Sequence, residues 1–166
     1  NNNTGNYSVW STNWGAGGSL LLTFGHPSSG AGKIALFDHS VSAGAAFITS
    51  TNTFANATWH HVAISRSGTT CKLYVNGVEE ASGTQSTNLT RNVFVTGAVY
   101  TTGTDPFLGY MSNVRVVKGT AVYTSAFTPS TTPLTAITNT ELLTCQSNRF
   151  IDNSTNAHSI TVNGDP

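Results

Sequence analysis

The sequence predicts an all-β fold, a two-sheet antiparallel β-sandwich that forms a single domain over residues 1–166. Apolar and polar residues alternate over many short segments, whereas a helical period is almost absent. Clusters of Gly, Asn, Ser and Pro separate these segments at near-regular spacing, which favours a sandwich or barrel over alternating strands and helices. The chain is long enough for a real core, since a domain of about 150 residues buries roughly 68–70% of the surface that its unfolded chain exposes.

Eleven segments read as strands. They are short, apolar and bounded by turn residues, as expected for strands. In order they cover residues 8–10, 19–26, 33–38, 45–50, 60–65, 70–75, 78–83, 93–96, 109–118, 141–145 and 159–162.

The strongest strand signal is a hairpin formed by residues 60–65 and 70–75. Both runs are rich in β-branched and aromatic residues, and a polar turn joins them. Asn76 and Gly77 then open a second turn. Because successive strand residues point to opposite faces, the set that starts at Cys71 and continues through Leu73 should face the core.

Residues 109–118 form another long apolar run, and its two faces are poorly sorted. That pattern predicts a central strand covered on both sides. The prolines at positions 129 and 133 cannot lie inside a regular strand, because proline has no N–H for the ladder. We expect the segment around them to cross over the sandwich in an extended conformation.

The composition is neutral and unusually poor in charge. Charged residues make up 8% of the chain, against about 25% in an average soluble protein. The formal net charge is zero with no basic stripe, so nucleic-acid binding has little support. No apolar run approaches the roughly 20 residues of a membrane span, so we expect no membrane insertion. A neutral chain rich in Thr and turn residues is typical of an extracellular or virion protein, and its start at Asn1 predicts a processed terminus or an excised piece.

The two cysteines, Cys71 and Cys145, lie far apart in predicted strands with apolar neighbours. Buried free thiols are the favoured interpretation, and a single disulfide is the alternative. Neither cysteine has the partner spacing of a zinc site.

Two sequence blocks resemble a known family. Residues 59–63, which read WHHVA, and residues 73–77, which read LYVNG, resemble the central hairpin of laminin-G-like domains in the concanavalin A-like lectin/glucanase superfamily. Residues 107–123 are similar to the C-terminal half of such domains in virion proteins of marine tailed bacteriophages. The similarity continues through residues 127–129, 133–137 and 142–154, and together it covers roughly residues 20–164.

The resemblance implies a concanavalin A-like jelly roll. It also implies that the first strands are shortened here or supplied by a neighbouring domain or subunit. The residues that carry the matching motif, and that we expect to be structural, are Trp59, His61, Tyr74, Asn76, Gly77, Gly109 and Arg115.

The resemblance further implies a non-enzymatic virion surface domain, either a capsid decoration or a fibre or appendage module. Its expected partners are other virion proteins or copies of itself, in a homo-oligomer, with cell-surface glycans as weak second partners. The expected location is the virion surface or another extracellular site. The alternative function is a secreted carbohydrate-binding, lectin-like module, and the third is a glycoside hydrolase.

Catalysis has weak support in the residues themselves, so we expect no catalytic site. Glycoside hydrolysis needs two carboxylates across the scissile bond. Glu79 and Glu80 are adjacent, so on a strand they face opposite sides, and Glu141 is the only other glutamate. We interpret the Glu79–Glu80 pair as part of a solvated strand edge.

Sugar binding needs an exposed aromatic ring beside short polar side chains, because the ring stacks on the sugar while the polar groups read its hydroxyls. Asn13 and Trp14 in one loop, and Tyr100 and Asp105 in another, are the best candidates. The alternative is that each ring caps the hydrophobic core.

We expect no cofactor and no dedicated metal site. Calcium is the alternative left open, since laminin-G-like relatives hold Ca²⁺ at the sandwich rim through oxygen ligands. The loop aspartates Asp38, Asp105 and Asp152 are the weak candidates for such a site. Asp152 also fits an Asx-type turn.

Overall fold

The computed structural model describes residues 8–15, 17–41, 45–103 and 105–163. Within these ranges the protein is built from strands and turns without a helix, so nothing in them could cross a membrane as a long apolar helix. The strands are β1 (Ser8–Ser11), β2 (Leu20–Phe24), β3 (Ile34–Asp38), β4 (Ile48–Thr49), β5 (Val62–Ser67), β6 (Thr70–Val75), β7 (Val78–Thr84), β8 (Val95–Thr96), β9 (Val114–Val117) and β10 (Thr140–Thr144).

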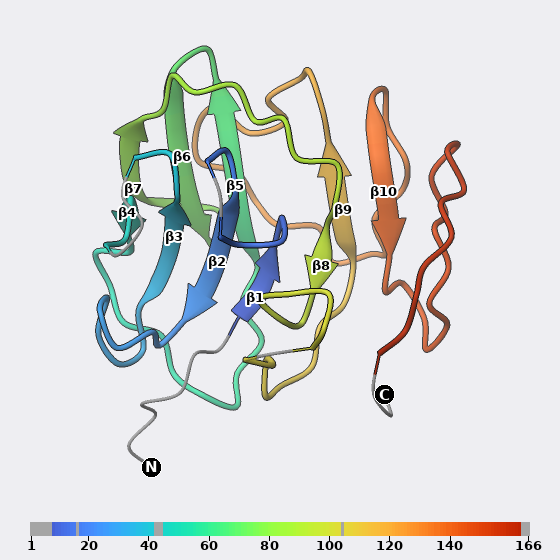
Figure 1. The fold of residues 1–166 in the computed structure, drawn as a ribbon, viewed down its shortest axis with the longest axis horizontal. Helices are drawn as coiled ribbons and strands as arrows, with labels where there is room; N and C mark the ends of the chain where they lie inside the picture. Colours follow the sequence, from blue (N-terminus) through green and yellow to red (C-terminus); the bar gives the residue numbers. More distant parts are fainter. Residues whose placement is uncertain (1–7, 16, 42–44, 104, 164–166) are drawn as a thin grey trace.

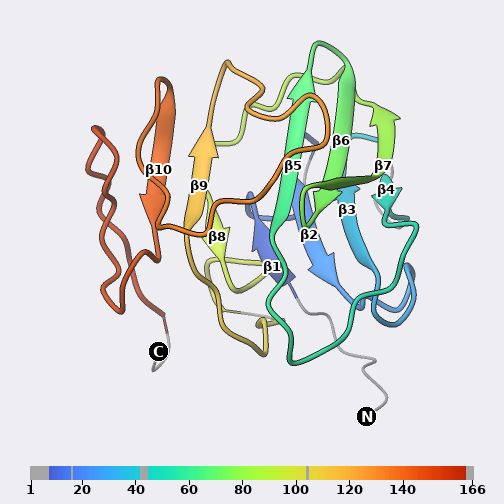
Figure 2. The same cartoon turned by 180° about the vertical axis from the view of Figure 1, so that it is seen from behind.

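The strands form two layers, as the β-sandwich prediction required (Figure 1). One layer is a five-stranded sheet in the order β4-β3-β2-β1-β8. The other contains the three-stranded sheet β5-β6-β7, and all the strand pairs are antiparallel. Seen from behind, the two-stranded sheet β10-β9 continues this second layer beside β5 (Figure 2). The second layer therefore reaches past the edge of the five-stranded sheet.

The main core lies between the two layers. Strand β6 contributes Cys71, Leu73 and Val75 to it, which confirms the expected alternation in this strand. Residues Leu22 and Leu36 face them from β2 and β3. Leu73 is fully buried at the centre of this core, and burial of such side chains between the layers supplies hydrophobic stabilisation.

A smaller cluster lies on the outer face of the five-stranded sheet. Leu21 and Phe37 point to this face, with Ala35 and Val99 buried beside them. Trp14 and Tyr100 pack against the cluster and are half-buried. The loops that follow β1 and β8 therefore fold back over their own sheet.

The segment after β9 crosses the outside of the second layer (Figure 2). The rings of Tyr123 and Phe127 stack at 3.6 Å, and Phe127 lies edge-on to Tyr74 at 5.6 Å between ring centroids. Tyr74 is consequently buried although it points away from the core. Gly77 accepts the Phe127 N–H at 2.9 Å; with φ at 82°, a Cβ there would lie 1.8 Å from the Phe127 carbonyl oxygen, so glycine is required at this close approach.

Several strand predictions were too long. The run predicted at residues 109–118 is a strand only at Val114–Val117, where all four residues are half-buried in a two-stranded sheet rather than central. Asn113 stops the strand, because its φ is 56° and its side-chain oxygen accepts the Leu134 N–H at 2.8 Å. The run at 45–50 shortens to Ile48–Thr49, and the described residues at 159–162 form no strand.

Both cysteines are free thiols. Burial raises the pKa of the Cys71 thiol to about 11. Cys145 lies one residue past β10 with φ at 58° and is only half-buried, so the expectation of a buried strand position was wrong for this cysteine.

Candidate functional site

The two loops chosen from the sequence for sugar binding meet on the outer face of the five-stranded sheet. Trp14 packs edge-on against Phe37, with ring centroids 6.2 Å apart, and Tyr100 belongs to the same apolar cluster. Ser11 ties the loops together, because its hydroxyl donates to the Val99 carbonyl and accepts the Asn13 N–H at 3.2 Å. The pairing of β1 with β8 and the Ser11 hydroxyl therefore hold these two loops, which are distant in the sequence, side by side.

Two histidines that were not among the predicted site residues complete this surface. His39 lies edge-on to Trp14 at 5.0 Å, and His26 is tilted against Phe37 at 4.6 Å. Neither histidine stands in a recognisable motif, and only strand pairing in three dimensions brings them together. We call the group of Trp14, His26, Phe37, His39 and Tyr100 the outer aromatic patch.

Burial favours the neutral form of one histidine in the patch, His26. Burial lowers the pKa of His26, and the negative charge of Asp105 offsets this only in part. The His26 Nδ1 accepts the Ser28 N–H at 3.1 Å, which requires that nitrogen to be unprotonated. Asp105, half-buried with φ at 51°, is the acidic group that acts on this corner of the patch.

The adjacent glutamates Glu79 and Glu80 make different structural contacts. Glu79 pairs with Lys72 at 2.8 Å on the exposed side of β7. Glu80 is buried, so the prediction of a solvated edge was wrong for this residue. It occupies the register shift between β6 and β7, and its carboxylate accepts the Asn52 backbone N–H at 2.9 Å and the Asn52 amide at 3.0 Å.

The aspartates considered for calcium lie apart. Asp38 is buried at the end of β3, where its Oδ1 accepts the Ser40 N–H at 2.8 Å, and Asp105 lies beside the outer aromatic patch. Among the described residues, no three His, Cys, Asp or Glu side chains gather as a metal ion would need. These aspartates do not fit one shared calcium site.

Asp152 forms the expected Asx-type turn and also accepts hydrogen bonds from residues outside that turn. Its Oδ1 accepts the N–H groups of Leu143 at 3.0 Å and Ser154 at 2.9 Å, and its Oδ2 accepts the His158 N–H at 2.9 Å. The Ser154 hydroxyl also donates to Oδ2 at 2.9 Å. Burial raises the pKa of this carboxyl, but these hydrogen bonds outweigh it and hold the pKa below the ordinary value of 3.8.

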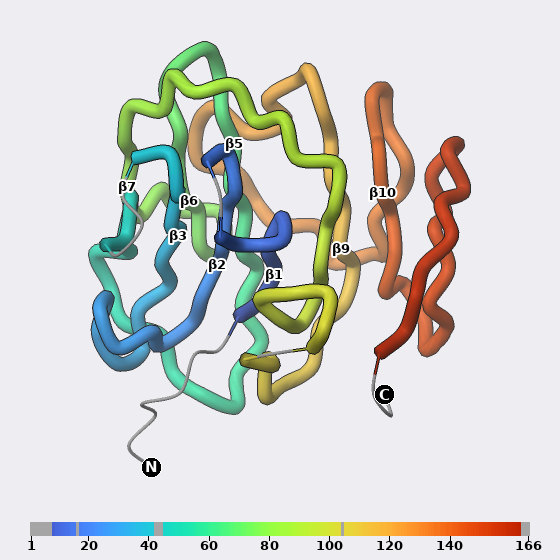
Figure 3. Tube along the Cα trace, in the orientation of Figure 1, coloured from blue at the N-terminus to red at the C-terminus, as the bar shows by residue number. Residues whose placement is uncertain are grey.

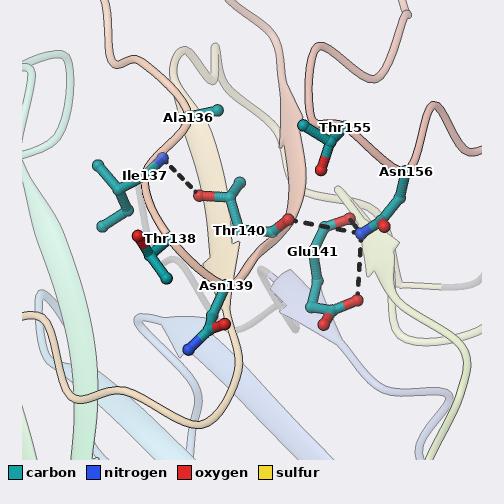
Figure 4. Close-up of a pocket in the computed structure, with 8 residues that line it drawn as sticks. All are labelled: Ala136, Ile137, Thr138, Asn139, Thr140, Glu141, Thr155 and Asn156. Carbon is teal, nitrogen blue, oxygen red and sulfur yellow. Dashed lines mark hydrogen bonds between the residues drawn. The ribbon is translucent and has the colours of Figure 1, made fainter.

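An open hollow of about 810 Å³ lies between the turn before β10 and the C-terminal segment (Figure 4). Asn156 closes one side, where its amide donates to the Glu141 carboxylate and to the Glu141 carbonyl, both at 3.2 Å. The hollow has no aromatic wall; its lining residues are Ala136, Ile137, Thr138, Asn139, Thr140, Glu141, Thr155 and Asn156. It lacks the ring that a sugar would stack on.

A second hollow, of about 380 Å³, lies on the outer face of the β5–β6 hairpin. It is lined by Ser65, Ser67, Thr70, Lys72, Tyr123 and Thr124. Residue patterns did not indicate this hollow, because its two walls are about 50 residues apart in the chain and hydroxyl side chains are common throughout. The alternation of the hairpin was the one available signal, since it puts these side chains on the face opposite the core.

The motif residues of the hairpin lie where the chain turns. Asn76 accepts the His61 N–H through its side chain at 3.0 Å and donates its own N–H to the His61 carbonyl at 2.8 Å. The His61 ring lies edge-on to Phe127 at 5.4 Å; burial, helped by the charge of Arg115, lowers its pKa.

Two other motif residues lie near the surface. Arg115 donates to the Thr135 carbonyl at 3.2 Å, and Gly109, exposed, sits so close to the Phe107 ring that a Cβ would come within 2.7 Å of it. Trp59, predicted to be structural, is 68% exposed, so its side chain lies outside the core.

A comparison with known protein families agrees with this architecture. The family model described as the concanavalin A-like lectin/glucanases superfamily matches residues 1–132. A crystal structure of a fragment of an S-layer domain-containing protein from Clostridium thermocellum is similar at 20% sequence identity with a TM-score of 0.33; the similarity covers 77% of this chain and 61% of the other. No curated protein matches. The chain belongs to the concanavalin A-like lectin/glucanases superfamily.

Proposed function

We propose that this domain is a non-catalytic attachment module on an extracellular surface, that its location is the surface of a virion, and that it holds glycans weakly through the outer aromatic patch. The observation that carries the glycan proposal is the convergence of Trp14 and Tyr100, with Asn13 and Asp105 on the same two loops, over one face of the sheet. The virion location rests on the resemblance of residues 107–123 to phage virion domains.

The chemistry of the patch suits a sugar ring. The half-buried faces of Trp14 and Tyr100 supply apolar area for the C–H face of a pyranose. Asp105 and Asn13 supply acceptors and a donor for its hydroxyls. Trp14 and Tyr100 are only half-buried, so we expect millimolar affinity and avidity from many copies.

The glutamates support a binding role over hydrolysis. Glu79 and Glu80 point to different partners, and Glu141 lies on β10 with Asn156 bonded to its carboxylate. A glycosidase needs two carboxylates about 5–9.5 Å apart that both face the substrate. We therefore expect that Glu141→Gln leaves glycan binding unchanged and that no β-glucan is cleaved.

The test is a glycan array followed by titration of the best ligand with Trp14→Ala and with Tyr100→Phe, which keeps the ring. We expect Trp14→Ala to lower the affinity about tenfold or more while circular dichroism shows a retained β-fold. Trp59→Ala removes an exposed tryptophan elsewhere and is the matched control. Unchanged binding by Trp14→Ala would rule out the patch as the glycan site.

A second element of the proposal is attachment to other proteins through the β9–β10 side of the second layer. Just before β9, Leu108 and Tyr110 are 73% and 88% exposed. Large exposed apolar residues in one segment often mark interaction sites. If the module is a virion component, it should co-purify with particles, and Tyr110→Ala combined with Leu108→Ser should reduce that association. A domain absent from purified particles would contradict the location.

A further inference from the structure

The hollow on the outer face of the β5–β6 hairpin has a floor built by strand pairing. Ser65 lies opposite Lys72, and Ser67 lies opposite Thr70. These four side chains alternate away from the core, so they form a compact square on the outer face. The segment after β9 supplies the wall through Tyr123 and Thr124. A volume of about 380 Å³ falls within the range of roughly 300–1,000 Å³ that small-molecule pockets occupy.

Ser65 is the unusual member of this square. It is only 8% exposed, and its hydroxyl finds no hydrogen-bond partner within the described part of the chain. Buried hydroxyls are almost always hydrogen-bonded, so an unpaired one that lines a hollow indicates a missing partner. A ligand hydroxyl could donate to this oxygen or accept from it, because a serine hydroxyl does both.

The wall of the hollow is rigid and aromatic. The Tyr123 ring stacks on Phe127 with an interplanar angle of 8°, and Phe127 in turn rests on the buried Tyr74. The ring is therefore fixed before any ligand arrives, which reduces the entropy lost on binding.

The hollow carries little net charge. Lys72 is its only ionic lining residue, and its ammonium group lies 2.8 Å from the Glu79 carboxylate and donates to the Thr124 carbonyl at 3.2 Å. An anion would have to compete with Glu79 for this ammonium group. Neutral hydroxyl groups instead match Ser65, Ser67 and Thr70 without breaking the ion pair.

We propose that this hollow is a second binding site, and that it takes a single neutral polyhydroxylated ring such as a monosaccharide unit. The site lies on the opposite layer from the outer aromatic patch and shares no residue with it. It goes beyond the proposed function, because a domain with one site on each face can bridge two glycan chains.

The test is an NMR titration of the isotope-labelled domain with a panel of neutral methyl glycosides, and in parallel with inorganic phosphate. We expect saturable shifts of the amides of Ser65, Ser67, Thr70 and Thr124 with at least one glycoside and none with phosphate. If no glycoside shifts these amides, the site is refuted. Shifts caused by phosphate alone would replace the neutral ligand with an anion and overturn the assignment.

Ser65→Ala separates a binding role from a structural one. Because the hydroxyl has no partner in the free domain, its removal should leave the thermal midpoint unchanged or slightly raised. The same variant should weaken glycoside binding about tenfold, the effect of losing one good hydrogen bond. Unchanged affinity in Ser65→Ala contradicts the proposal. Thr70→Val keeps the shape of the side chain but removes its hydroxyl, and it should also weaken glycoside binding.

Substitutions at the two sites should affect binding independently. Trp14→Ala should leave the amide shifts of the hollow intact, whereas Ser65→Ala should leave binding at the outer aromatic patch intact. A loss of both in either variant would mean that the hollow is not a site of its own.

Discussion

The sandwich core and the C-terminal unit, which comprises β9, β10 and residues 145–163, are stabilised in different ways. In the core, apolar side chains such as Leu22, Leu36 and Leu73 are almost completely buried. In the C-terminal unit Leu143 is the one large apolar side chain that the described residues bury fully, and neither core cluster includes it. Figure 3 shows residues 145–163 beside β10, at the margin of the molecule.

Polar contacts replace apolar burial in the C-terminal unit. One carboxylate, Asp152, accepts hydrogen bonds from residues before, within and after its own turn. Asn153 and Gln146 add a side-chain bond at 2.8 Å. We infer that the hydrophobic body unfolds as one cooperative unit and that order in the C-terminal unit depends on the Asp152 carboxylate. Each region should therefore respond to a different kind of change.

Leu73→Ala should produce the largest effect. Removing a fully buried leucine from β6 leaves a cavity between the layers, and such changes cost about 2–5 kcal/mol. Chemical denaturation should show the loss as a lower midpoint of a cooperative transition. Val78→Ala, at an exposed position on the neighbouring strand, is the control and should change the free energy of unfolding by less than about 0.5 kcal/mol.

Asp152→Asn should loosen the C-terminal unit selectively. Hydrogen bonds to a charged group are worth about 1.5–3 kcal/mol, and an asparagine turns its NH₂ toward donors that the carboxylate accepted. Hydrogen exchange should report a lower free energy of opening for the amides of Leu143, Ser154 and His158. The amides of β2 and β3 should keep theirs, and so should all amides in the control Asp105→Asn.

Acid should act on the two regions in two different pH ranges. The folded pKa of Asp152 lies below its ordinary value of 3.8, so its contribution is complete above that pH and is lost as the pH falls through the folded value. Burial lowers the pKa of His26 and His61, which lie outside the C-terminal unit. The free energy of unfolding of the region that contains these histidines should begin to fall at a higher pH. It falls as the pH drops below 6.5, because the unfolded chain then takes up protons more readily than the folded chain. A pH series of two-dimensional NMR spectra should resolve the two steps.

Glu80→Gln and Glu79→Gln compare a buried carboxylate with an exposed one on the same strand. Glu80 holds the Asn52 loop to β7, and its neutral replacement should cost on the order of 1 kcal/mol. Glu79 makes a solvent-exposed ion pair, and its replacement should cost between about 0 and 1 kcal/mol. Equal effects of the two changes would show that the buried contact adds nothing.

The regular part of the fold could be predicted from alternation, and the irregular part could not. The pattern in β6 correctly placed Cys71, Leu73 and Val75 in the core, because a strand covered on one face must alternate. The first residue of β9 is set by Asn113, which precedes it and has a positive φ. The side chain of Asn113 is hydrogen-bonded to Leu134, which lies 21 positions away in the chain. Local propensity carries no information on such a contact.

The candidate sites divide in the same way. Residue chemistry selected Trp14 and Tyr100, which the fold brings onto one apolar cluster. It could not place His26 or His39 beside them, nor bring Tyr123 to the hairpin hollow, since those neighbours arise from pairing between distant strands. The motif that contains Trp59 predicted a structural role for it and carried no information on its exposure, which is 68%.

Native-state hydrogen exchange at neutral and acidic pH is the most direct test of the division between the two regions. We expect the amides of Leu143, Ser154 and His158 to open with a smaller free energy than those of β2, β3 and β6, and to show a further loss of protection of their own as the pH falls below 3.8. If both groups of amides instead exchange at one common free energy that responds equally to pH, the core and the C-terminal unit form a single cooperative structure, and Asp152 does not stabilise the C-terminal unit separately.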